Sequence, residues 1–385
     1  MIPGVIDEPF PLVPLKRISP SRYGQLKACA LREVWTIGGS PILLPRNPLA
    51  ILGTIVHQLL KESGASAVRN GFDPERRWEQ LVAEMNQKLK ESQLETMLFP
   101  LETSARMFEV LKIRACALAA QISSTAKERG LGSTGVSGTG LELWVESKDK
   151  AIGGWIDSAR RTKDGIVLSD FKSGEVLEQA DGISQKQLKV SHRIQLKMYA
   201  GLYFQSYGIW PSTIQIVPLV GPKLEVSFTH EECSQLLEEA ALTLGSLNSR
   251  ICTEAASVYE ALASPSPQNC RFCSYRPACP KYRKAREPGD QTDGWPSDAF
   301  GKVWDINVLQ DGHVNLRVAG AKGEQCTFRS LSPLSKRHPA LEAIQRGDEV
   351  GIFNARVSTN RAEFSEGTLT VLYKFEGTAP PHYNS

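Results

Sequence analysis

The chain has 385 residues, of which 41% are hydrophobic and 23% are charged, and its formal net charge is +3. This balance excludes wholesale disorder, which requires low hydrophobicity together with a high net charge. No apolar run approaches the length of about 18 residues that a membrane-spanning helix needs. The N-terminus lacks the basic-then-apolar order of a signal peptide, so we expect a cytoplasmic protein without a membrane partner.

The first half of the chain is predicted to be helical, because apolar residues recur there at helical spacing. The predicted helices cover 19–37, 49–63, 75–95 and 100–129. Short segments separated by turn signals follow and predict the strands of a meander. These strands cover 141–147, 152–159 and 166–172. Further along the chain we expect a helix at 184–207, strands at 212–219 and 223–228, and a helix at 230–263.

The last part of the chain is predicted to be a separate all-β domain. We expect a first domain over residues 1–288, a turn-rich linker over 289–298 and a small β-barrel-like domain over 299–385. The strands of this domain are predicted at 300–308, 314–319, 325–329, 349–357 and 368–375, with a short helix near 339–346. An OB-like barrel that binds single strands fits this count. The alternative is a β-domain that packs on the rest of the chain or binds a protein.

The central meander carries residues that indicate catalysis. Asp157 ends one predicted strand, and Asp170 and Lys172 lie near the end of the next. Residues i and i+2 of a strand point to the same face, so Asp170 and Lys172 should project together, and a neighbouring strand can place Asp157 beside them. Two carboxylates suit Mg²⁺ or Mn²⁺, which could activate a water for attack on a phosphodiester. The alternative is an exposed strand on which acidic and basic residues alternate.

Three more residues are candidates for the same site. His57 follows Gly53 by one helical turn, and glycine there leaves room for close packing against a sheet. Gln195 and Tyr199 lie four residues apart on the predicted helix after the meander, so they share a face, and its apolar flanks predict that it is buried. A buried glutamine needs a polar partner, either in the site or on the backbone. A structural histidine is the alternative for His57.

Three cysteines form the pattern C-x2-C-x5-C, at Cys270, Cys273 and Cys279. Disulfides are rare in a reducing compartment, so the spacing favours a metal centre, and Cys29 is the candidate for a fourth ligand. Zinc and an iron–sulfur cluster both accept four thiolates, and the spacing does not decide between them. The remaining possibility is that these cysteines carry no metal.

Two groups of basic residues are candidates for binding nucleic acid, because basic side chains neutralise phosphates and aromatic rings stack on bases. The first group shares one face of the predicted helix at 184–207 and comprises Lys186, Lys189 and Arg193. A solvated helix face is the alternative for this group. The second group follows the cysteines, has Tyr275 and Tyr282 interleaved, and comprises Arg271, Arg276, Lys281 and Arg283.

The motifs occur in a fixed order along the chain. They are Cys29, GTIVH (53–57), Glu142, GGWID (153–157), DFKSG (170–174), QLKMY (195–199) and the three later cysteines. This order resembles the RecB-like branch of the PD-(D/E)xK nucleases. More narrowly, it is similar to the iron–sulfur members, namely the AddB-type nuclease domains and the CRISPR- or replication-associated exonucleases.

The resemblance implies an α/β fold with a restriction-endonuclease-like core, a mixed central sheet and helical insertions. It also implies a deoxyribonuclease that uses Mg²⁺ or Mn²⁺ and carries a [4Fe–4S] cluster. The metal ligands it implies are His57, Asp157, Asp170 and the backbone carbonyl of Phe171. The catalytic residues it implies are Asp157, Asp170, Lys172, Gln195, Tyr199 and Glu142. The cluster ligands it implies are Cys29, Cys270, Cys273 and Cys279.

We therefore expect a metal-dependent nuclease for single-stranded DNA or single-stranded ends, an exonuclease or flap-type enzyme of repair, recombination or defence. A helicase or a repair or defence protein is a possible partner. One alternative is a non-catalytic DNA-binding or scaffold subunit of a helicase–nuclease complex. Another is a zinc-stapled protein of different function.

Overall fold

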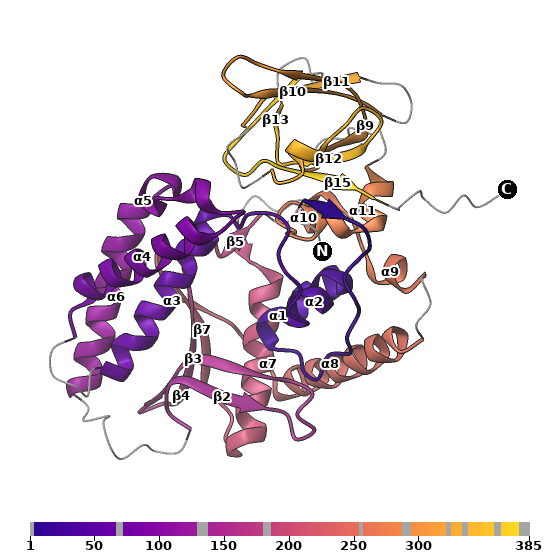
Figure 1. Cartoon of the computed structure of the whole chain (residues 1–385). Helices are drawn as coiled ribbons and strands as arrows, with labels where there is room; N and C mark the ends of the chain where they lie inside the picture. The colour runs from indigo at the N-terminus through magenta and orange to yellow at the C-terminus, as the bar shows by residue number, and fades with distance from the viewer. Residues whose placement is uncertain are drawn as a thin grey trace.

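A five-stranded mixed sheet lies at the centre of the larger part of the molecule (Figure 1). In spatial order its strands are β2 (Gly140–Glu146), β3 (Gly153–Thr162), β4 (Gly165–Lys172), β7 (Thr213–Pro218) and β8 (Leu224–Glu225). The first three form an antiparallel meander, β7 joins β4 in parallel, and β8 is antiparallel to β7. The computed structural model describes residues 4–66, 72–128, 138–179, 186–253, 257–286, 294–320, 325–332, 338–357 and 363–376.

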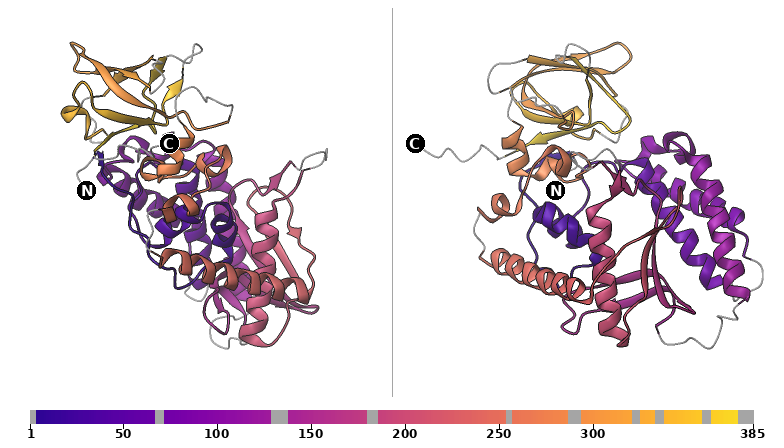
Figure 2. Two further views of the ribbon diagram at one scale, coloured as in Figure 1. Left: turned by 90° about the vertical axis from the view of Figure 1, so that its right-hand side faces the viewer. Right: turned by 180° about the vertical axis from the view of Figure 1, so that it is seen from behind.

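Helices lie on both sides of this sheet (Figure 2). One side carries α3 (Pro48–Ser66), α4 (Pro74–Glu91) and α6 (Phe108–Glu128), and η1 (Thr96–Leu98) and α5 (Leu101–Ser104) connect the last two. The other side carries α7 (Val190–Tyr207), which packs against α1 (Pro20–Ala28) and α8 (His230–Ile251). No helix in the described part of the chain is both long and apolar enough to cross a membrane.

The alternation of side chains along β4 explains how the sheet separates two cores. Ile166 and Leu168 pack in the core that contains α7, whereas Phe171 packs with α3 and α6. The strand is paired on both edges, and a separate core covers each of its faces, so its later residues are buried on both faces. Asp170 and Lys172 continue the face of Ile166 and Leu168, and they end the strand.

Local signals in the sequence set two of the helix starts. Asp73 caps α4, since its side chain accepts hydrogen bonds from two backbone N–H groups of the first turn. Thr229 caps α8, as predicted, and forms a reciprocal capping box with Glu232. Each cap satisfies backbone donors that the helix itself leaves without partners.

The helix predicted over 19–37 is interrupted at Cys29. The backbone of Cys29 is extended (φ −158°, ψ 99°), and it separates α1 from α2 (Ala30–Ile37). The apolar spacing continues across the break, which is why the sequence does not reveal it. The break allows α1 and α2 to pack against each other. It also places Cys29 between the two helices, outside the regular turns of either.

Two other predicted helices are shorter than expected. The one predicted from residue 184 begins only at Val190, after a two-stranded ribbon of β5 (Leu177–Glu178) and β6 (Gln187–Leu188), and residues 184–185 lie outside the described part. The one predicted to reach 263 ends at Ile251, and α9 (Ser257–Leu262) is separate. The cysteine segment that follows forms α10 (Pro267–Cys270), η2 (Arg276–Ala278) and α11 (Pro280–Ala285).

The C-terminal part is a curled sheet with a core of its own (Figure 2). Its strands are, in spatial order, β1 (Val5–Ile6), β15 (Val371–Phe375), β12 (Glu349–Phe353), β9 (Ala299–Val308), β10 (Val314–Ala319), β11 (Gln325–Leu331), β14 (Glu363–Ser365) and β13 (Arg356–Val357). The five predicted strand regions are confirmed, although the one at 349–357 is divided at Asn354, which has a φ of 55°. The predicted helix near 339–346 is only the short turn η3 (Leu341–Ala343).

The N-terminal arm belongs to this C-terminal sheet. Strand β1 pairs in parallel with β15, with Val5 opposite Lys374 and Ile6 opposite Phe375. The larger core also continues into the C-terminal sheet, because Phe353 and Tyr373 are buried in it. The expected division into domains at 288 and 299 stays a prediction, and contacts cross it in this structure.

The predicted linker over 289–298 is packed where the structure describes it, from residue 294 onward; residues 289–293 lie outside the described part. The Asp298 carboxylate is fully buried and forms an ion pair with Arg276, with 2.7 Å between the nearest atoms. Trp295 contacts the ring of Tyr282. This segment therefore fixes the C-terminal sheet against the cysteine segment.

Candidate active site

A cavity of about 560 Å³ opens at the end of the central sheet. Six of the predicted site residues line it: His57 on α3, Asp157 on β3, Asp170 and Lys172 on β4, and Gln195 and Tyr199 on α7. Residues from separate parts of the sequence thus meet at one place, as the motif order implied. The cavity is large enough for a small part of a polymeric substrate, and it is open to solvent.

Lys172 and Gln195 are joined through Asp170. The Lys172 Nζ lies 2.8 Å from Asp170 Oδ2 and donates a hydrogen bond of 3.2 Å to Gln195 Oε1. The Gln195 Nε2 donates to Asp170 Oδ1 at 2.6 Å. The buried glutamine is therefore satisfied within the site and not by the backbone. It holds the carboxylate and the ammonium in a fixed relation.

Asp157 is held by the neighbouring strand. Its Oδ2 accepts a hydrogen bond of 2.6 Å from the backbone N–H of Phe171. Burial, followed by the negative charge of Asp170, raises the pKa of Asp157 well above its ordinary value. Two buried carboxylates in one site, one of which raises the pKa of the other, are a favourable setting for a cation.

Asp170 has an oxygen that the protein does not fully satisfy. Its Oδ2 is buried and forms no hydrogen bond in the described part of the chain, although Lys172 Nζ lies close to it. A carboxylate oxygen has more than one acceptor site, so beside the ion pair with Lys172 this oxygen can accept a further partner from the cavity. A metal ion or a bound water would supply that partner.

His57 faces the same cavity as a neutral imidazole. Burial lowers the pKa of His57, and the positive charge of Lys172 lowers it further. Gly53 allows this helix to approach the sheet, because a Cβ at Gly53 would lie only 2.9 Å from Ser173 Oγ. The close packing predicted from Gly53 is therefore confirmed. A neutral imidazole is the form that binds metals.

Glu142 lies beside the cavity without lining it. On β2 it lies between Leu141 and Leu143, which pair with Ser158 and Ile156, the neighbours of Asp157 on β3. Its φ of 50° is in the left-handed region that is unfavourable for glutamate. Its carboxylate lies 3.6 Å from Lys61 Nζ. The charge of Glu142 contributes to the raised pKa of Asp157, so the two carboxylates interact electrostatically.

The chemistry of these donors fits a divalent metal. Two carboxylates, a neutral imidazole and a carbonyl are ligands that Mg²⁺ or Mn²⁺ accepts. Within the residues that the structure describes, however, no three His, Cys, Asp or Glu side chains are grouped closely enough to hold an ion by themselves. Asp170 faces Lys172 here, so binding an ion would require its carboxylate to share that contact.

The family model of the PD-(D/E)XK nuclease superfamily matches residues 17–280, a range that contains every residue of the cavity. The chain belongs to the PD-(D/E)XK nuclease superfamily. Its members are nucleases that act on DNA and generally use divalent metals such as Mg²⁺. The predicted restriction-endonuclease-like α/β fold is confirmed for this nuclease. No curated protein matches the chain.

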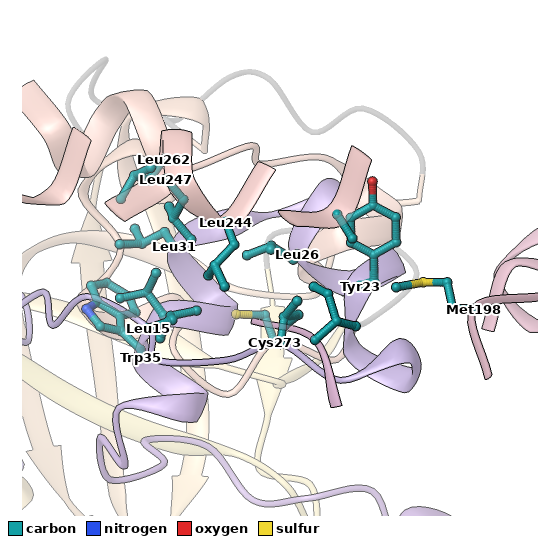
Figure 3. Close-up of a cluster of buried hydrophobic side chains, with 14 of the residues drawn as sticks. Leu15, Tyr23, Leu26, Leu31, Trp35, Met198, Leu244, Leu247, Leu262 and Cys273 are labelled. Carbon is teal, nitrogen blue, oxygen red and sulfur yellow. The ribbon is translucent and has the colours of Figure 1, made fainter. Parts of the chain in front are cut away.

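The four predicted cluster ligands of the nuclease, Cys29, Cys270, Cys273 and Cys279, line one small cavity. Figure 3 shows the sulfur of Cys273 among apolar side chains that include Leu15 and Leu244. Burial raises the pKa of the Cys270 thiol to about 12 and also raises the pKa of Cys273 and Cys279. These three thiols are therefore protonated without a bound cation, and a metal centre would have to displace their protons.

The second basic group of the nuclease contains one residue that cannot bind DNA. Arg276 is 2% exposed, and its guanidinium contacts Asp298, Asn354 and backbone carbonyls of the cysteine segment. The assignment of Arg276 as a nucleic-acid-binding residue is wrong, because its guanidinium is buried and forms an ion pair with Asp298. The interleaved rings of Tyr275 and Tyr282 are buried too.

For the remaining basic residues, binding of nucleic acid stays a prediction, and their surroundings differ from those expected. Arg271 and Arg193 are exposed. Lys186 pairs with Glu175 at 2.8 Å and lies before α7, so the predicted basic stripe is not a continuous helix face. The others form further internal contacts: Lys189 Nζ donates to the carbonyl of Glu175, Lys281 Nζ to those of Glu260 and Ala263, and Arg283 lies over Phe375.

Nine residues that line the same cavity were not among the predicted site residues. They include Arg17, Ser21, Trp144 and Trp155. A signal existed for one of them, since Trp155 lies inside the GGWID motif, two residues before Asp157, and so shares its strand face. Arg17 comes from the segment that precedes α1 and Ser21 from the first turn of α1, and no strand or helix pattern in the sequence could have placed them at this cavity.

Proposed function

We propose that this nuclease is a metal-dependent deoxyribonuclease of the RecB-like type that hydrolyses phosphodiester bonds in single-stranded DNA or at single-stranded ends. The observation that carries the proposal is the convergence of Asp157, Asp170 and Lys172 on one cavity. We further propose that it acts as an exonuclease or flap-type enzyme in repair, recombination or defence, alongside a helicase or another protein of such a pathway.

The proposed metal site uses His57, Asp157, Asp170 and the carbonyl of Phe171. Bound Mg²⁺ or Mn²⁺ would stabilise charge on the phosphate and lower the pKa of a water. The protein's own contribution is to hold these donors in a fixed arrangement at the wall of the cavity. The hydrogen bond from Phe171 N–H to Asp157 orients that carboxylate and leaves its other oxygen for a ligand.

Lys172 is proposed to act on the phosphate directly. An ammonium has three N–H groups, and Asp170 and Gln195 lie next to two of them, so a third is left for a phosphate oxygen or the attacking water. In the transition state the charge on the phosphate oxygens grows, and a preorganised ammonium stabilises that charge. Gln195 is a positioning residue in this scheme, because it contacts both Lys172 and Asp170.

We propose a [4Fe–4S] cluster on Cys29, Cys270, Cys273 and Cys279. The support is that four thiols from distant parts of the chain line one cavity. Such a cluster would join the break between α1 and α2 to the cysteine segment, and a link between distant residues restrains a long loop. Zinc on the same thiols is the competing assignment, and iron analysis of anaerobically purified protein separates the two.

The test of the nuclease function is a cleavage assay with end-labelled single-stranded, double-stranded and flapped DNA in Mn²⁺. We expect metal-dependent cleavage with preference for the substrates that have single-stranded ends. Folded protein that cuts none of the three under any divalent ion would refute the proposal. It would favour a non-catalytic DNA-binding subunit instead.

A further inference from the structure

The wall of the catalytic cavity contains a tryptophan that the fold leaves in solvent. Trp155 lies on β3 and is 53% exposed, although large aromatic rings are usually buried. It stands two residues before Asp157 on the same strand face, a separation of about 6.7 Å along a strand. This is comparable to one nucleotide step of an extended single strand, so a base stacked on this ring would lie about one nucleotide from a phosphate bound at Asp157.

A second tryptophan supports the first. Trp144 on β2 is directly opposite Trp155 in the sheet register, and the two ring centroids are 5.2 Å apart in an edge-to-face arrangement. Gly153 makes room for this ring, because a Cβ there would come within 3.1 Å of Trp144 Cζ2. The pair is thus held by the backbone of two strands, which gives Trp155 a fixed orientation before any ligand binds.

Cationic groups lie over both rings. Lys61 Nζ is 5.9 Å from the centre of the Trp155 ring, and the Arg17 guanidinium is 4.9 Å from that of Trp144. Lys61 is half exposed, and its 3.6 Å ion pair with Glu142 is of the weak surface kind. A ligand that stacks on Trp155 would move Lys61, whose ammonium could then pair with a phosphate of the same ligand.

The proposed deoxyribonuclease activity determines which ligand fits, and the following inference depends on it. An exposed aromatic ring with a displaceable cation beside it is an arrangement that can bind a nucleobase together with its phosphate. Inside a duplex both faces of a base are already stacked, so only an unpaired base can offer a face to Trp155. We propose that Trp155, supported by Trp144, is a stacking subsite for an unpaired nucleobase one nucleotide from the scissile phosphate.

The test measures DNA binding in the Lys172→Ala background, so that the substrate stays intact. A labelled single-stranded oligonucleotide and a blunt duplex of the same sequence are titrated by fluorescence anisotropy in Mg²⁺. Trp155→Ala should weaken single-strand binding by roughly 5- to 150-fold, the range for loss of one base–aromatic stack, and should change duplex binding much less. Trp155→Phe should restore most of the affinity, because it retains an aromatic face.

The matched control is Trp304→Ala, which removes another exposed tryptophan, on β9 of the C-terminal sheet. The proposal is overturned if Trp155→Ala binds single strands as the Lys172→Ala background does, or if it weakens both DNAs equally. It is also overturned if Trp155→Phe binds single strands as weakly as Trp155→Ala, or if Trp304→Ala produces the loss instead.

Cleavage by the parent protein is assayed in parallel. A parent that cuts DNA while Trp155→Ala binds normally refutes the subsite alone. A parent that cuts no DNA refutes the nuclease function.

Discussion

The ammonium of Lys172 lies 2.8 Å from the carboxylate of Asp170, and the two side chains leave the same face of β4 at the mouth of the catalytic cavity. Their spacing of two residues makes this contact possible, and Gln195 from α7 fixes it through hydrogen bonds to both. Asp170, Lys172 and Gln195 therefore form one interacting unit, and DNA cleavage should depend on all three.

Replacing Lys172 by alanine should reduce DNA cleavage by at least about 100-fold, since loss of one preorganised donor to a transition state has an effect of that order. The measurement is the initial rate on a single-stranded substrate in Mn²⁺. The control is Lys163→Ala, at the exposed turn between β3 and β4. Equal rates for the two variants would contradict a catalytic role for Lys172.

Replacing Gln195 by leucine should slow cleavage about tenfold or more and destabilise the fold by about 1–3 kcal/mol, because the buried Asp170 loses a hydrogen-bond donor. Cleavage rates and urea unfolding measure the two effects. Gln205→Leu changes an exposed glutamine on the same helix and should alter neither. A Gln195→Leu variant that is less stable but equally active would show that Gln195 is only structural.

Replacing Asp157 by asparagine should stabilise the metal-free protein at alkaline pH. Burial and the charge of Asp170 raise the pKa of Asp157, so the folded state holds this proton more tightly than the unfolded state. The resulting stabilisation is complete below the pKa of an unfolded aspartate and is lost as the pH rises through the raised value. Asparagine is neutral throughout, and it can still accept the hydrogen bond from Phe171.

The measurement for Asp157→Asn is the melting temperature against pH in the presence of a chelator. The gain over the parent should grow as the pH rises above the usual range of aspartate and should vanish in acid. Asp164→Asn, on an exposed turn, should give no such trend. A constant difference at every pH would mean that the ionisation of Asp157 does not limit stability.

Replacing Cys273 by alanine should lower iron content, stability and DNA binding together, because the proposed cluster ties α1 and α2 to the cysteine segment. Iron analysis, visible absorbance and thermal unfolding of anaerobically purified protein measure the effect. Cys252→Ala, at an exposed cysteine, is the matched control. A Cys273→Ala protein as stable as the parent would remove the structural role.

Replacing Arg276 by methionine should destabilise the protein by about 3–5 kcal/mol, since it leaves the buried charge of Asp298 without a partner. Arg271→Met changes an exposed arginine of the same segment and should have little effect on unfolding by urea. If the two variants are equally stable, the Arg276–Asp298 pair does not hold the C-terminal sheet in place.

Local sequence patterns were enough to predict the faces of β4 and α7 that line the cavity. The two-residue spacing of Asp170 and Lys172 and the four-residue spacing of Gln195 and Tyr199 each specify a shared face, because strands and helices have fixed periods. The same periodicity predicted where β2, β3 and β4 begin to within one residue, although β3 continues past the predicted end at 159 to Thr162. Local signals such as the Thr229 cap were equally reliable, since they depend only on neighbouring residues.

Which charged side chains are buried in ion pairs and which are exposed could be seen only in the three-dimensional structure. Arg276 and Arg271 look alike in the sequence, yet one is buried against Asp298 and the other is exposed. The pairing of β1 with β15 and the meeting of Trp144 with Trp155 likewise join residues that no local pattern relates. The physical reason is that periodicity describes one element at a time, whereas burial and ion pairing depend on partners supplied by distant segments.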